Sequence, residues 1–313
     1  MSVTEPLTKS VNDKQGITLG AWTDDASYIS LNGHRIAYWQ AGSGEPLLLI
    51  HGFPTAAWDW QYLWHDLAQQ YRVITLDLLG YGLSDKPWPH QYRIAEQADL
   101  IMALTDALDI DKYHLLAHDY GDTVAQELLA RHNLISNDMN IETNNSEGFI
   151  NSLCLLNGGL FPETHRPVFT QKLLISPLGS LFSRFFTKKK LSKSFSAIFG
   201  ENSPPDPKEI DGFWSLIENN NGQRVMSGLI RYMVERKQNR SRWVGALQQS
   251  RLPIRVINGV DDPISGEHML VNYEKLIPRP DVVRLKGIGH YPQVEAPELV
   301  QASYLAFRKK IST

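Results

Sequence analysis

Short apolar runs rich in Leu, Val and Ile recur along the chain, and each is followed within a few residues by glycine. They cover residues 47–50, 72–76, 113–117, 152–156, 254–257 and 282–285. Strands buried on both faces have this pattern, because helices cover both sides of a parallel sheet. Segments with helical periodicity, such as residues 58–70 and 94–108, separate several of the runs. The alternation predicts an α/β fold with a mostly parallel central sheet and helices on both faces.

Three breaks in this alternation divide the chain. Residues 1–22 are polar without a clear period, which predicts an N-terminal arm. Residues 28–39 alternate around Asn32-Gly33, which predicts a β-hairpin. Residues 157–249 lose the strand pattern and carry Phe, Leu, Trp and Lys at helical spacing. We therefore expect a helical cap inserted into a core made of residues 23–156 and 250–313.

A helix and a loop are expected between the apolar runs at 113–117 and 152–156. The helix after residue 117 is expected to end near His132. The segment that follows, residues 134–149, is rich in Asn and Ser and predicts a surface loop.

Composition narrows the possible partners. The net charge of −3 argues against nucleic acid or an anionic membrane as the main partner. No run of about 18 apolar residues is present, so no membrane span is expected. The N-terminal residues lack the apolar segment of a secretory signal, which makes the cytoplasm the expected location. Because neither a CxxC nor an HExxH pattern occurs, we expect no metal or other cofactor.

Three acid–base residues follow apolar runs: Asp119, Asp262 and His290. In open α/β sheets the carboxyl ends of the strands form the site, so these side chains are expected to converge. Asp119 stands at a sharp strand-to-helix turn, where many hydrolases carry the serine of a G-x-S-x-G elbow. The order nucleophile, acid, histidine is that of an α/β-hydrolase.

Four short motifs carry a family resemblance: HGFP at 51–54, HDYG at 118–121, DDP at 261–263 and GHYP at 289–292. From about residue 28 to 310 the chain resembles the α/β-hydrolase superfamily. Within it, the chain resembles the aspartate-nucleophile branch of epoxide hydrolases and haloalkane dehalogenases. The longer segments HDYGDTVAQELL, LLNGGLFPETHRP and GHYPQVE resemble segments of the mesoderm-specific transcript (MEST) proteins, in core and cap alike. This last resemblance indicates lineage but supplies no substrate.

The resemblance also assigns supporting roles. It selects Asp262, the third residue after Gly259, as the acid, with Asp261 in reserve as a turn residue. It implies that the backbone N–H groups of Phe53 and Tyr120 form the oxyanion hole.

A carboxylate at the elbow favours attack on an sp³ carbon, because it is already ionised and needs no activation. The product is an alkyl ester of Asp119. His290, held by Asp262, then deprotonates a water molecule that hydrolyses the ester. The expected substrate is a small apolar electrophile, and water is the second reactant. The sequence does not indicate an oligomeric state.

The leaving group separates the candidate reactions. Dehalogenases resembling this chain use side-chain N–H donors at the positions of Phe53 and Tyr120, neither of which offers an N–H side chain, so dehalogenation ranks second. An epoxide needs a proton donor, and Tyr232, the single tyrosine of residues 157–249, fits the family's second cap tyrosine. The alternative for Tyr232 is a surface position on an amphipathic helix.

No first cap tyrosine is apparent, and His165 is a candidate substitute donor. The sequence thus favours an epoxide hydrolase, with a haloalkane dehalogenase or lactone-type hydrolase as alternatives. A non-catalytic binding or signalling protein of this fold is the alternative of another class. Lys188, Lys189 and Lys190 are interpreted as a solvated face of the cap, in preference to a membrane contact.

Overall fold

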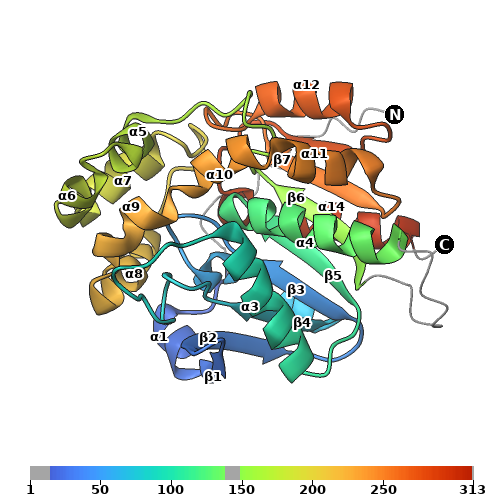
Figure 1. Ribbon diagram of the computed structural model, residues 1–313, viewed down its shortest axis with the longest axis horizontal. Coiled ribbons are helices and arrows are strands. Elements are labelled where there is room, and N and C mark those ends of the chain that lie inside the picture. Colours follow the sequence, from blue (N-terminus) through green and yellow to red (C-terminus); the bar gives the residue numbers. More distant parts are fainter. Residues whose placement is uncertain (1–14, 138–148, 312–313) are drawn as a thin grey trace.

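The central element is an eight-stranded sheet in the order β1-β2-β4-β3-β5-β6-β7-β8 (Figure 1). The computed structural model describes residues 15–137 and 149–311. The strands are β1 (Ser27–Leu31), β2 (His34–Ala41), β3 (Pro46–Ile50), β4 (Arg72–Leu76), β5 (Tyr113–His118), β6 (Ile150–Leu156), β7 (Ile254–Gly259) and β8 (Val282–Leu285). The pairs β1–β2 and β2–β4 are antiparallel, and all the other pairs are parallel. The predicted fold class is confirmed.

The first two strands form the predicted hairpin. Asn32 and Gly33 connect them with φ angles of 50° and 82°. A two-residue turn with positive φ at both positions matches the right-handed twist of the flanking strands, and Asn-Gly adopts it readily.

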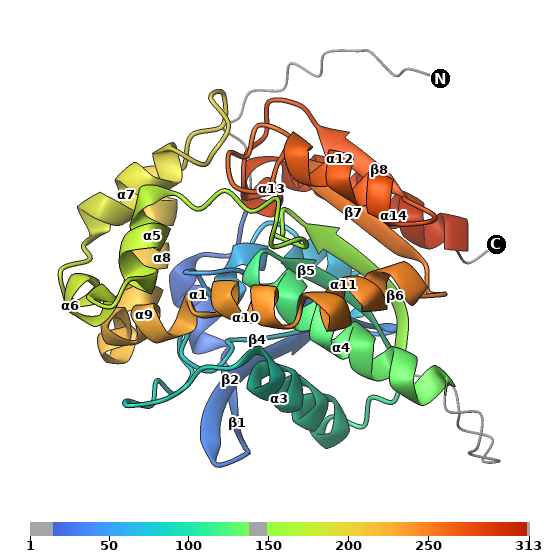
Figure 2. The same cartoon turned by 45° about the horizontal axis from the view of Figure 1, so that its top comes forward.

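Helices cover both faces of the sheet. On one face lie α3 (Ile94–Ala107), α4 (Tyr120–Asn137) and α11 (Arg240–Gln249), which run side by side in Figures 1 and 2. Helix α14 (Pro297–Ile311) packs against β7 on the other face. Helix α4 runs five residues beyond the end predicted at His132. The rest of the predicted surface loop, residues 138–148, lies outside the described residues.

Short helices gather beyond the carboxyl ends of the parallel strands, at the left of Figure 1. They are α5 (Phe169–Ile175), α6 (Gly179–Arg184), α7 (Lys188–Ser196), α8 (Pro207–Glu218), α9 (Met226–Leu229) and α10 (Tyr232–Gln238). Helix α11, which falls within the predicted cap range 157–249, packs along α4 on the core. The division into arm, core and cap stays a prediction. None of the described helices is long and apolar enough to cross a membrane.

The predicted arm, residues 1–22, is described only from residue 15. Its last residues begin helix α1 (Leu19–Asp24). Trp22 is buried there, and its ring stacks on that of Trp39 at 4.8 Å between centroids. This contact anchors the described end of the arm on strand β2.

Candidate active site

The predicted nucleophile lies at the turn between β5 and α4. Asp119 has a φ of 46°, in the left-handed region, and its side chain is 3% exposed. A non-glycine residue held in that conformation stores about 1–3 kcal/mol of strain, which the surrounding packing must offset. Glycine makes the turn possible, because a Cβ atom at Gly121 would lie 2.4 Å from the carbonyl oxygen of Ile50. The elbow therefore presses directly against β3.

The three predicted catalytic residues come together at the carboxyl ends of the strands. His290 Nδ1 lies 2.8 Å from Asp262 Oδ2, and His290 Nε2 lies 3.9 Å from Asp119 Oδ1. All three side chains are buried. Asp262 Oδ2 also accepts hydrogen bonds from Asn157 Nδ2 at 3.0 Å and Ser265 Oγ at 2.7 Å. These donors fix the carboxylate so that it orients the imidazole.

The neighbouring acid, Asp261, is exposed at the surface. The structure thus separates two adjacent aspartates, and it places the preferred one, Asp262, against His290.

The two oxygens of the Asp119 carboxylate have different surroundings. The backbone N–H of Phe53 donates a hydrogen bond to Oδ2 at 3.1 Å. Tyr291 contributes to holding this loop, because its hydroxyl donates to the Phe53 carbonyl at 3.2 Å. Tyr120, the other predicted donor, is the first residue of α4 and directly follows Asp119. Unlike Oδ2, the oxygen Oδ1 of Asp119 faces His290 and the cap.

The predicted cap tyrosine lies in the site. Tyr232 is fully buried, and its hydroxyl is 3.5 Å from Asp119 Oδ1. Its ring packs against Tyr120 at 4.8 Å and Phe53 at 6.4 Å between centroids. The alternative expectation, a surface position on an amphipathic helix, is wrong for this residue.

Besides Asn157 and Ser265, a charged residue next to Asp119 was not anticipated from the sequence. Arg236 lies one turn after Tyr232 on α10 and is 2% exposed. Its Nε donates to Thr123 Oγ1 at 2.7 Å, and its Nη2 donates to the Asp119 carbonyl at 3.3 Å. Nη2 also lies 3.8 Å from Asp119 Oδ1. The i,i+4 spacing from Tyr232, which puts both residues on one helix face, was the available signal.

His165 lies beside this pair. A Cβ atom at Gly159 would fall within 3.0 Å of both Arg236 Nη1 and His165 Nδ1, so the two side chains border the same glycine. Neither ring nitrogen of His165 has a hydrogen-bond partner among the described residues. Burial and the Arg236 charge lower the pKa of His165 to about 3. The imidazole is therefore neutral near pH 7.

The pKa values of His290 and Asp262 are shifted in opposite directions. Burial opposes charge on the His290 imidazole, but the carboxylates of Asp262 and Asp119 outweigh it and raise the pKa of His290 to about 9. Burial likewise favours the neutral acid at Asp262, but His290 and the hydrogen bonds to the carboxylate lower its pKa to about 2. In the free protein near neutral pH, a protonated His290 therefore lies between two carboxylates.

A small cavity of about 50 Å³ opens next to His290 and Phe53. Leu174 of α5, Phe195 of α7 and Met226 of α9 form much of its other wall. The lining is predominantly apolar, as expected for a site that excludes bulk water.

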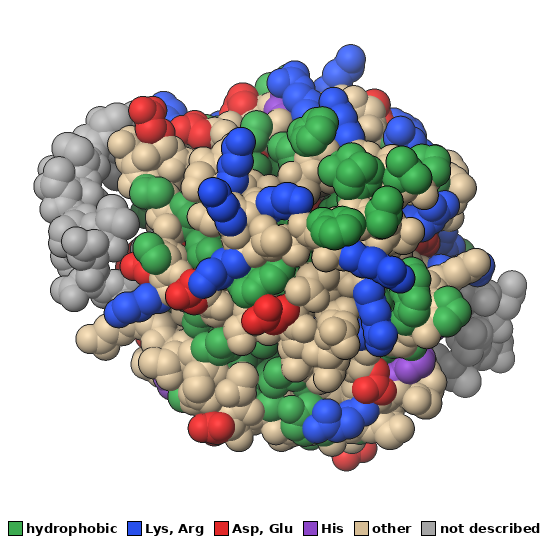
Figure 3. All heavy atoms as spheres, turned by 90° about the vertical axis from the view of Figure 1, so that its left-hand side faces the viewer, with side chains coloured by type: hydrophobic (Ala, Val, Ile, Leu, Met, Phe, Trp, Pro, Cys, Tyr) green, Lys and Arg blue, Asp and Glu red, His purple; other side chains and the backbone are tan. Residues whose placement is uncertain are grey.

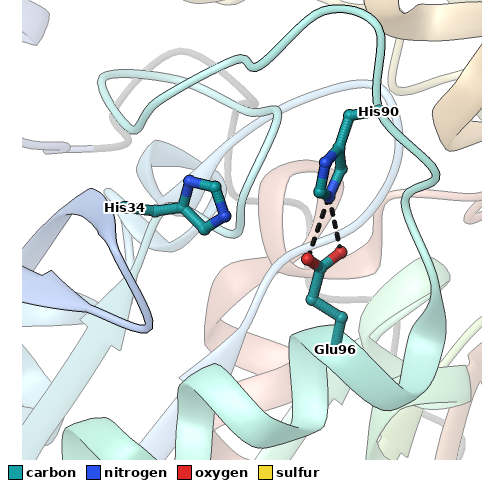
Figure 4. Close-up of side chains that lie close together, drawn as sticks. All are labelled: His34, His90 and Glu96. Carbon is teal, nitrogen blue, oxygen red and sulfur yellow. Dashed lines mark hydrogen bonds and ion pairs between the residues drawn. The ribbon is translucent and has the colours of Figure 1, made fainter.

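Among the described residues, one group has the arrangement of metal ligands: His34, His90 and Glu96. Figure 4 shows His90 and Glu96 paired, with His34 beside them. None of the three belongs to the catalytic set.

A family model for the alpha/beta hydrolase fold matches residues 45–297. The chain belongs to this α/β-hydrolase family. The mesoderm-specific transcript protein of Mus musculus is 41% identical over 303 residues, which cover 92% of this chain and 87% of the relative. Within the family, the chain is thus a member of the MEST group, which confirms the resemblance read from its motifs.

Other relatives have named activities. A soluble epoxide hydrolase of Corynebacterium sp. is 39% identical over 95 residues, which cover 30% of this chain and 33% of the relative. The crystal structure of the haloalkane dehalogenase DatA of Agrobacterium tumefaciens matches with a TM-score of 0.73 and 20% identity, covering 90% of this chain and 96% of that chain. The first match is partial and the second shows the fold alone. The chain is accordingly an α/β-hydrolase that shares part of its sequence with an epoxide hydrolase and its fold with a dehalogenase.

Proposed function

We propose that this protein hydrolyses small epoxides through a covalent ester on Asp119. One observation carries the proposal: the Phe53 N–H binds Oδ2, whereas Oδ1 faces Tyr232 and His290. One oxygen is thus held as the future ester carbonyl, and the other points toward the cap as the attacking atom.

In the first step, Oδ1 of Asp119 attacks a ring carbon of the epoxide. The C–O bond of the ring breaks, and its electron pair stays on the epoxide oxygen. Tyr232 is the proton donor to that oxygen. Burial and the Asp119 charge raise the pKa of the Tyr232 hydroxyl, so it remains protonated until an alkoxide forms beside it.

In the second step, a water molecule attacks Cγ of the ester and gives a proton to His290 Nε2. Alkylation has removed the charge of Asp119, which was one cause of the raised pKa of His290. The imidazole therefore loses its proton more readily in the ester than in the free protein, and it becomes available as a base. The developing oxyanion is Oδ2, which already accepts the Phe53 N–H. Collapse breaks the bond between Cγ and Oδ1, and His290 gives its proton to the departing Oδ1, which leaves as part of the diol. The oxygen of the water molecule stays on Cγ, and the new carboxylic acid returns a proton to the Tyr232 oxygen, which restores both Asp119 and Tyr232.

Haloalkane dehalogenation is the second candidate, and the buried Arg236 supports it. This guanidinium lies close to Asp119, and its Nη1 has no partner among the described residues. A cap cation with a spare N–H is suited to a departing halide. Arg236 thereby supplies a donor that the side chain of Phe53 lacks.

Oxygen labelling tests the proposal. The protein is incubated with small epoxides or haloalkanes in water enriched in ¹⁸O. The mass of the peptide that contains Asp119 is then measured by mass spectrometry. Repeated turnover of an ester intermediate places label in the Asp119 carboxylate. Label with epoxides supports the leading reaction, and label with halide release alone reverses the ranking. Hydrolysis without label in Asp119 contradicts the covalent route, and no turnover with either class favours the non-catalytic alternative.

Replacing Tyr232 by Phe is expected to slow epoxide opening by about 10²-fold, because the alkoxide then lacks its proton donor. Single-turnover rates with an epoxide measure the effect. Tyr113→Phe is a matched control, since Tyr113 is also buried but lies at the opposite end of β5. Equal rates for the Tyr232 variant and the wild type would remove the donor role.

A further inference from the structure

The outer face of the cap combines exposed apolar side chains with an unbalanced positive charge. Four large hydrophobic residues of α5, α6 and their flanks are more than half exposed: Phe169 at 78%, Leu178 at 59%, Leu181 at 51% and Phe185 at 61%. We call these four residues the apolar cap patch. Large exposed apolar clusters in soluble proteins mark surfaces that contact another phase or partner.

The charge around this patch differs from that of the whole chain. Residues 164–200 contain seven Lys and Arg and no Asp or Glu, although the chain as a whole has a net charge of −3. The seven, all exposed, are Arg166, Lys172, Arg184, Lys188, Lys189, Lys190 and Lys193. Figure 3, which views the left-hand side of Figure 1, shows hydrophobic side chains gathered in the upper part of this face with Lys and Arg around them.

Several of these cations have no counter-charge within residues 15–137 and 149–311. Lys188 pairs with Asp211 at 2.9 Å, and Lys190 donates to the Phe185 carbonyl at 2.8 Å. Lys172, Lys189 and Lys193 form no ion pair with any described residue. The predicted solvated face of the cap is thus an open cationic surface that borders exposed apolar side chains.

The helices beneath are apolar on both sides. Leu174 of α5, and Leu191 and Phe195 of α7, are buried and line the cavity next to His290. Phe169 of α5 points outward on the same short helix. Cavity packing explains the inner apolar residues, but it offers no reason for the outer ones.

We propose that the apolar cap patch and the surrounding Lys and Arg dock this protein on an anionic lipid bilayer surface. Apolar side chains enter the boundary between headgroups and acyl chains, and basic side chains bind anionic headgroups. The charge selects this partner over a second copy of the chain, because two identical cationic faces repel each other. The net negative charge of the chain does not oppose this docking, because salt screens protein charges that lie more than about 10 Å from a lipid headgroup.

Vesicle co-sedimentation with the full chain tests the docking. Wild-type protein is expected to sediment with vesicles of equal parts phosphatidylcholine and phosphatidylserine, and far less with phosphatidylcholine alone. Phe169→Ser with Phe185→Ser should weaken binding by about tenfold or more, because the apolar insertion is lost. Lys189→Gln with Lys193→Gln should weaken it by roughly tenfold and reduce its dependence on salt.

Val271→Ser with Leu299→Ser is the matched control, since these residues are 55% and 42% exposed but lie on α12 (Glu267–Leu276) and α14 of the core. Thermal unfolding of every variant should match the wild type, because no substituted residue is buried. Absence of wild-type binding overturns the proposal. Binding that the core pair weakens as much as the cap pairs also overturns it, as does a cap patch that drives self-association in sedimentation without vesicles.

Discussion

A His290→Gln variant is expected to react once with an epoxide and then stop. Attack by Asp119 needs no base, because the carboxylate is already ionised, so the alkyl ester still forms. Hydrolysis of that ester needs a proton acceptor, and Gln cannot replace the imidazole near the carboxylate. Steady-state turnover should fall by roughly 10²- to 10⁴-fold. Intact-protein mass spectrometry should show one adduct with the full mass of the substrate.

Two variants control this experiment. Asp119→Asn with His290→Gln should form no adduct, because the amide is a poor nucleophile. His65→Gln, at an exposed position on α2 (Trp64–Ala68), should turn over like the wild type. An adduct on a peptide other than that of Asp119, or undiminished turnover by His290→Gln, would disprove the two-step route.

Strand positions were predictable because burial on both faces leaves a strong local signal. The runs at 47–50 and 152–156 fall within β3 and β6. The hairpin was predictable because Asn-Gly favours the positive φ angles of its turn. The end of α4 was not, since the last described turn carries exposed Leu134 and Ile135. Exposed apolar residues in an Asn-rich segment do not form the apolar stripe along one face that marks a helix in the sequence.

The core half of the site was predictable for a topological reason. Asp119, Asp262 and His290 each follow a strand of one sheet, so the fold brings them together. Asn157 also follows a strand, β6, and its amide donates a hydrogen bond to Asp262. The same topological reasoning therefore predicts its position in the site. The i,i+4 spacing puts Arg236 on the helix face of Tyr232, but its contact with Asp119 could not be predicted, because that contact depends on how this helix packs over the elbow. A single sequence records no such long-range packing.

The second large prediction concerns the charge on Asp262, which accounts for much of the raised pKa of His290. In Asp262→Asn the carboxylate is lost while burial remains, so the pKa of His290 should fall from about 9, and the imidazole should lose its proton at lower pH. The Asn amide can donate to Nδ1, which leaves the proton on Nε2 and blocks uptake of a proton from water. Ester formation should persist while ester hydrolysis slows by about 10⁴-fold, as in serine hydrolases with this change.

NMR titration of the imidazole and a burst experiment with an epoxide measure the two effects of Asp262→Asn. Asp261→Asn is the sharpest control, because the adjacent side chain is exposed and the structure gives it no contact with His290. If Asp261→Asn slowed hydrolysis and Asp262→Asn did not, the acid of the site would be misassigned. If both variants left the titration of His290 unchanged, the field at the imidazole would have another source. An effect confined to Asp262→Asn would tie the orientation and the charge state of His290 to one buried carboxylate, and with them the release of the ester.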